Sequence, residues 1–176
     1  MTSLLPTRLE TIIIIGFTAV TIAACSAQIK YVEGGPRSDD KHETLLRLVA
    51  DRTGIISKII MPLLILFAGR NNFLQWLTRW DFATFIAFHR WVARVVFILV
   101  FIHSIANTAA YLMSGRYYTR MQNNFMIWGT IATVASGIIT FQGMLYFRKN
   151  WYEMFLIIHI IMAALFIGVS GFMLMD

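Results

Sequence analysis

The chain has 176 residues, of which 58% are hydrophobic and 14% charged. A soluble domain carries about 45–50% apolar residues, so this composition, with a mean hydropathy of +0.67, excludes an ordinary soluble domain and predicts several membrane crossings. The net charge of +6 comes from bases scattered through short polar stretches. That pattern favours contact with membrane lipid and argues against nucleic-acid binding.

The first apolar run covers residues 11–29, and we assign residues 1–29 to a first transmembrane helix. Two alternatives compete with it. Arg8 before a short apolar core with small residues behind it also fits a signal peptide, and residues 22–25 resemble a bacterial lipoprotein cleavage box. The helix is the better interpretation because several more apolar runs follow, with little soluble chain to export.

Residues 30–53 form a polar stretch, which we predict to be a loop. Gly34, Gly35 and Pro36 mark a turn. Residues 40–50 fit a short amphipathic helix within this loop. His42 lies among charged neighbours and is interpreted as a solvated histidine.

Four further apolar runs predict transmembrane helices at residues 54–69, 82–113, 125–147 and 154–175. Pro62 should kink the first of them. The run 82–113 is longer than the roughly 20 residues that a bilayer requires. The expected fold is therefore all-α, a polytopic bundle of five transmembrane helices, with residues 54–175 as its main domain.

Three histidines lie within these runs: His89, His103 and His159. Ionisable residues inside membrane spans are costly and usually functional, although a single one often makes only a helix–helix hydrogen bond. The runs 82–113 and 154–175 point in the same direction, because one antiparallel helix separates them. His89 and His159 both lie near the start of their runs, so they can face each other at one depth. Two opposed neutral imidazoles form an axial site for haem iron.

His103 follows His89 by fourteen residues, which places both on one helix face about 21 Å apart. It therefore needs a partner of its own at a second depth. Fourteen residues beyond His159 is Met173, where a thioether could ligate iron. Val96 and Phe166 lie midway between the depth of His89 and the depth of His103. Their side chains predict that this region is apolar.

Arg90 and Arg94 share one helix face near His89. Their forked donors suit the carboxylates of haem propionates, and Arg94, the deeper of the two, is the better candidate. Arg90 alternatively reaches the lipid interface. Zinc is disfavoured, because His89 and His159 alone are too few ligands for a closed site.

Residues 50–77, 88–104 and 152–168 resemble the membrane domain of the ferric reductase and NADPH oxidase family, most closely fungal ferric-chelate reductases. The most specific feature is HRW-x-x-R from His89, with His103 fourteen positions after that histidine. The resemblance implies a six-helix bundle with two b-type haems held by histidines of the third and fifth helices. His89 and His159 would then form the inner site, and His103 half of the outer one.

The resemblance also implies an activity: electrons pass from NADPH to FAD, cross both haems and reach ferric chelates outside the plasma membrane. The sixth helix and the FAD/NADPH domain have no counterpart in this sequence, so the flavin domain would be separate or missing. Two other functions stay open. One is an inactive truncated fragment or a regulatory haem-binding subunit, and the other is the membrane domain of a superoxide-producing oxidase.

The sequence departs from the family pattern at three places. Ala93 stands where the family usually has glycine, Met173 replaces the expected outer histidine, and the resemblance ends after Gly168. The codons of Val169 and Ser170 can match an intron donor, so we expect residues 169–176 to be read-through of a retained intron. The distribution of basic residues favours an external N-terminus, whereas the resemblance places it in the cytosol.

Overall fold

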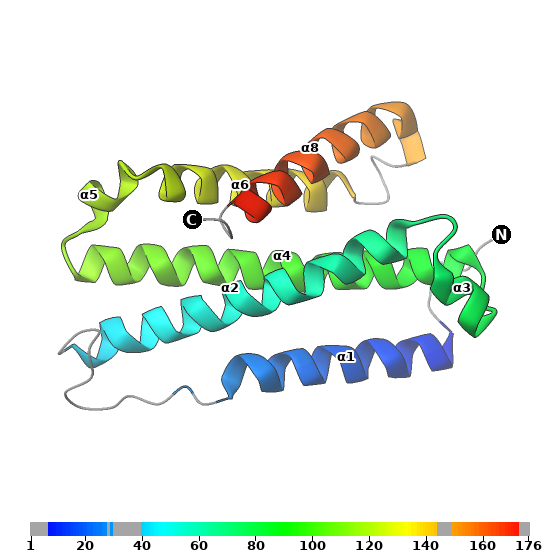
Figure 1. Cartoon of the computed structure of the whole chain (residues 1–176), viewed down its shortest axis with the longest axis horizontal. Coiled ribbons are helices and arrows are strands. Elements are labelled where there is room, and N and C mark those ends of the chain that lie inside the picture. The colour runs from blue at the N-terminus through cyan, green and yellow to red at the C-terminus, as the bar shows by residue number, and fades with distance from the viewer. Residues whose placement is uncertain (1–6, 28, 30–39, 144–148, 173–176) are drawn as a thin grey trace.

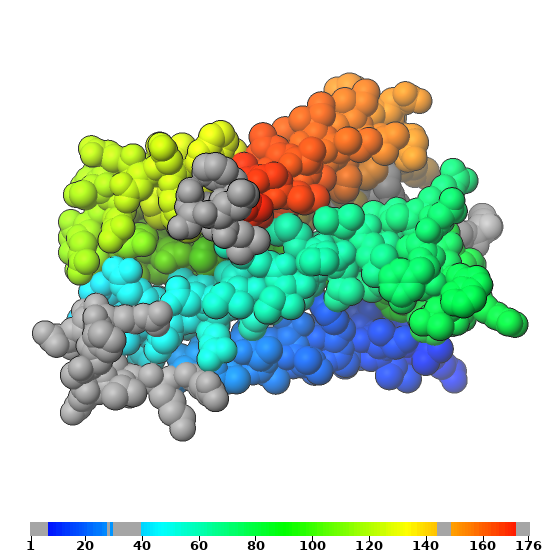
Figure 2. Space-filling view, viewed as in Figure 1, coloured from blue at the N-terminus to red at the C-terminus, as the bar shows by residue number. Residues whose placement is uncertain are grey.

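The structure is a computed structural model, and it describes residues 7–27, 29, 40–143 and 149–172. Over these residues the fold is all-α, and its helices are α1 (Arg8–Ser26), α2 (Lys41–Ala68), α3 (Phe73–Thr78), α4 (Phe82–Met113), α5 (Tyr117–Met121), α6 (Asn124–Gln142) and α8 (Tyr152–Phe172). The long helices lie side by side in a bundle (Figure 1). In the space-filling view, α1, α2 and the α6–α8 pair form three adjacent rows across one face (Figure 2).

Four of the described helices, α1, α4, α6 and α8, are long and apolar enough to cross a membrane. They confirm a polytopic helical membrane protein. The predicted bounds of α4 agree with the structure at both ends. Residues 144–148 and 173–176, where the predicted fourth and fifth spans end and where Met173 lies, are outside the described residues.

Helix α2 differs from the expected polar loop and separate span. Residues 41–53 are helical and continue without a break into 54–68. The helix predicted at residues 40–50 is therefore present, but the loop predicted to separate it from the next span is not. Asp40 starts the helix, because its side chain accepts a hydrogen bond from the backbone N–H of His42 at 2.9 Å, a typical N-cap. An 18-residue stretch ending at Ala68 contains Asp51, Arg52 and Lys58, which gives α2 more charge than the four apolar helices.

An ion pair within the polar first half of α2 positions an arginine against α4. Glu43 is buried and its carboxylate lies 2.8 Å from the guanidinium of Arg47, one helical turn later. That guanidinium also lies 4.9 Å from the centre of the Tyr111 ring on α4, a cation–π contact. These contacts explain why a polar sequence is helical here.

Glu43→Ala is therefore expected to lower the free energy of unfolding by about 1–3 kcal/mol, because Arg47 loses its partner at a half-buried position. The thermal midpoint in detergent measures this. The matched control is Glu153→Ala, which removes an exposed carboxylate at the start of α8. Equal midpoints for the two variants would show that the Glu43–Arg47 pair does not hold α2 in place.

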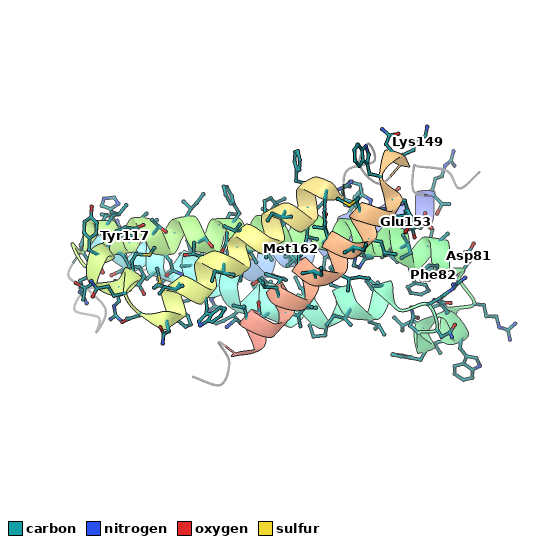
Figure 3. All side chains as sticks on the ribbon, turned by 90° about the horizontal axis from the view of Figure 1, so that it is seen from above. Asp81, Phe82, Tyr117, Lys149, Glu153 and Met162 are labelled. Atoms are coloured by element: carbon teal, nitrogen blue, oxygen red, sulfur yellow. The ribbon has the colours of Figure 1, made fainter. Side chains whose placement is uncertain are left out.

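Helices α4 and α8 run in the same direction, as expected. Asp81 and Phe82 lie at the same end of the bundle as Lys149 and Glu153, and Tyr117 lies at the opposite end (Figure 3). Helix α8 packs mainly on α6 and makes few contacts with α4. This separation leaves room for a cavity between α4 and α8.

Candidate functional site

A cavity of about 400 Å³ lies between α2, α4, α6 and α8. Its volume is in the range of small-molecule and cofactor sites, about 300–1,000 Å³. Aliphatic, small and aromatic side chains form most of the wall, and the polar side chains in it are His89, Ser136, Thr140 and His159. Two histidines thus face a mostly apolar space.

His89 and His159 come together in this cavity. Their ring centroids are 6.3 Å apart and the ring planes are inclined by 62°. Nitrogen-to-metal bonds of about 2.0–2.1 Å place the centroids of two imidazoles opposed across one metal about 6 Å apart. The observed separation of the two ring centroids fits such a pair. It also means that the two histidines lie at the same depth in the bundle, as the sequence predicts.

The orientation of His89 is fixed by α2. Its Nδ1 lies 2.9 Å from the carbonyl oxygen of Leu64. Because a carbonyl only accepts, Nδ1 carries the proton, and in the neutral ring Nε2 keeps its lone pair. Metal-ligating histidines commonly donate their other ring N–H in this way. Nothing in the sequence pattern pointed to Leu64 as this partner.

His159 lacks a hydrogen bond like the one that orients His89. Its Nδ1 is buried and has no hydrogen-bond partner within the described residues, while the ring of Phe155 lies 5.2 Å away. A buried polar atom without a partner is uncommon and requires an explanation. The donor set, two imidazoles across an apolar cavity, fits axial ligation of a haem iron better than any hard cation.

His103 lies elsewhere, in contact with α2. Its Nδ1 donates to the carbonyl oxygen of Ala50 at 2.7 Å, and its Nε2 accepts from the amide of Asn107 at 3.2 Å. A methyl group at Gly54 would lie 2.6 Å from Nδ1 of this ring. The ring therefore occupies space that is free because glycine has no side chain. A glycine at this position in the sequence could have indicated that another residue packs closely against the helix.

Neither arginine lines the cavity that the histidine pair faces. Arg90 and Arg94 are absent from the residues that line the cavity, whereas His89 and Ala93, each one position earlier, line it. Arg94 is exposed, and its guanidinium lies 4.6 Å from the centre of the Trp91 ring. The described residues contain no group of three or more histidine, cysteine, aspartate or glutamate side chains that could hold a metal ion.

The side chains expected midway between the depths of His89 and His103 are buried. Val96 and Phe166 are buried in one cluster, and both line the cavity beside the histidines. Packing alone accounts for these two side chains.

Comparison with known proteins gives one family. The family model described as "Ferric reductase like transmembrane component" matches residues 53–169. The chain is 49% identical over 169 residues to ferric/cupric reductase transmembrane component 1 of Candida albicans, covering 96% of this chain and 22% of that protein. It is 34% identical over 165 residues to ferric reductase transmembrane component 3 of Saccharomyces cerevisiae, covering 94% of this chain and 23% of that protein. The chain thus spans less than a quarter of the length of these relatives, and no solved structure matches it.

Proposed function

This chain belongs to the ferric reductase like transmembrane component family, and we propose that it is the transmembrane electron-transfer domain of a ferric-chelate reductase in the plasma membrane. The fifth crossing would be formed by residues 54–68 of α2. In this proposal NADPH and FAD, on another part of the protein or on a separate domain, supply electrons, and ferric chelates outside the cell accept them.

The pairing of His89 with His159 carries the proposal. Their rings lie 6.3 Å apart across an apolar cavity between the long helices, and the Leu64 carbonyl orients one of them. These two residues would hold a b-type haem, which supplies one-electron redox chemistry when bound. The apolar walls would exclude water from the iron, a condition that tunes redox potential.

A second haem is part of the proposal, with His103 as one ligand. His103 and His89 lie on the same face of α4, separated by about 21 Å along its axis. The Asn107 amide, which now donates to Nε2 of His103, would have to turn away to free that nitrogen.

Lipid vesicles containing the purified chain test electron transfer directly. A ferric chelate is trapped inside and a membrane-impermeant reductant is added outside. We expect ferrous iron to form inside these vesicles faster than in protein-free vesicles, and we expect the His159→Leu variant to lose this difference. Equal rates in both kinds of vesicle would reject the electron-transfer role. Superoxide formation in vesicles that contain oxygen but no ferric chelate tests the oxidase alternative.

The propionate role of Arg94 gives a separate prediction. If its guanidinium leaves Trp91 to bind a propionate, Arg94→Gln removes one charge-assisted hydrogen bond of about 1.5–3 kcal/mol, which corresponds to haem binding weakened roughly 10–150-fold. Haem titration of the apoprotein measures this. Arg116→Gln, at an exposed position between α4 and α5, is the matched control. An affinity unchanged in Arg94→Gln would assign the arginine to its observed contact with Trp91.

A further inference from the structure

A second apolar pocket lies between α6 and α8. It has a volume of about 680 Å³ and shares no lining residue with the histidine cavity. Among the described residues of its wall, only Gln142, at the end of α6, has a primary amide. The pocket is thus a separate site, which contains none of the histidines discussed above.

The Gln142 side chain is buried without a partner. The residue is 8% exposed, and within the described part of the chain neither Nε2 nor Oε1 makes a hydrogen bond. Burying an amide without compensating hydrogen bonds is costly. A leucine at this position would avoid that cost, so the amide is a strong indication of a bound polar group.

The remaining wall of the pocket suits a flat ring. Phe141, Trp151 and Phe155 line it, together with the thioether of Met154. Aromatic side chains pack favourably against other π systems in offset or edge-to-face arrangements, and a thioether sulfur also favours aromatic neighbours. An alkyl chain would gain none of these contacts and would leave the Gln142 amide unpaired.

We propose that this pocket binds a membrane-dissolved ring of the quinone class, with the Gln142 amide paired to one ring oxygen. A primary amide can donate from Nε2 to a carbonyl, or accept at Oε1 from a hydroxyl. The same side chain therefore serves the quinone and its reduced quinol. The ring would contact Phe155, whose own ring centroid also lies 5.2 Å from that of His159.

Binding is tested on the purified full chain in nanodiscs of one defined phosphatidylcholine. The probes are menadione, a naphthoquinone without an isoprenoid tail, and ergosterol, a flat lipid with one hydroxyl group; equilibrium dialysis or scintillation counting with labelled probe gives the affinity. We expect saturable binding of menadione. We expect Gln142→Leu to weaken that binding at least tenfold, and Gln122→Leu, at an exposed position at the other end of the bundle, to leave it unchanged.

Thermal unfolding of the same samples shows whether the variant folds. Gln142→Leu should unfold at an equal or higher temperature than the wild type without probe, because an unpaired buried amide is removed. Menadione should raise the midpoint of the wild type and not that of the variant. Absence of saturable menadione binding, equal affinity in Gln142→Leu, or Gln142-dependent binding of ergosterol alone would overturn the proposal. Haem content is measured separately, so failure here is distinct from failure of the histidine site.

Discussion

His159→Leu is expected to abolish the bis-histidine haem spectrum of this chain. The substitution removes one of two rings that lie 6.3 Å apart and leaves His89 with no opposing imidazole. Loss of a residue that only hydrogen-bonds a metal ligand weakens metal binding by about 10–100-fold. Loss of an axial ligand itself should therefore weaken haem binding by about a hundredfold or more. Haem titration of the apoprotein and the optical spectrum of the product measure the effect.

A control variant and a double variant test whether the loss of haem is specific to the His89–His159 pair. His42→Leu changes an exposed histidine at the start of α2 and should leave haem binding unchanged. His89→Leu should match His159→Leu, and the double variant should lose little more than either single one, because residues that act as a unit are not additive. A bis-histidine haem spectrum retained in His159→Leu would show that His89 pairs with another histidine.

Gly54→Ala is expected to destabilise the protein although alanine is the better helix former. The gain in helix propensity is about 1 kcal/mol. Against it, the added methyl carbon would lie 2.6 Å from Nδ1 and 2.7 Å from Cε1 of His103, so the ring must move and its hydrogen bond to the Ala50 carbonyl must break. Overpacking costs about 1–3 kcal/mol and the lost hydrogen bond about 1 kcal/mol more, so the net effect is a loss of about 1–3 kcal/mol.

Gly16→Ala in α1 is the matched control, because a methyl carbon there meets no atom within 4 Å and should leave stability equal or slightly higher. The double variant Gly54→Ala with His103→Ala should recover part of the loss, since the clash disappears with the ring. Thermal unfolding reports stability, and the haem spectrum reports whether His103 is a ligand. If the Gly54→Ala protein were as stable as the Gly16→Ala protein, the ring of His103 would not be packed against Gly54.

The sequence was sufficient to predict features that follow from helix periodicity. The bounds of α4 and the meeting of His89 with His159 required only the length of the apolar runs and the reversal of direction between them. Helical phase also explains the position of Arg94. Arg94 lies one residue beyond Ala93, and a turn of about 100° per residue directs it away from the cavity that Ala93 lines.

Contacts between distant parts of the chain could not be predicted. The pattern of residues 40–50 predicted a short helix, but not its contact with α4, where Arg47 lies over the ring of Tyr111, 64 positions later. The same holds for His103, whose ring packs on Gly54 and Ala50 of another helix. Gln142 was missed for a related reason. Its run carries no charge, and only the packing of α6 on α8 shows that the amide is buried without a partner.

The haem-to-protein ratio of the purified chain, with its reduced and oxidised optical spectra, tests the central proposal most directly. The pairing of His89 and His159 predicts one bis-histidine, low-spin haem b per chain, present in His42→Leu and lost in His159→Leu. A wild-type chain that folds and remains free of haem when haem is supplied would contradict it, and would remove His89, His103 and His159 from the role of ligands together.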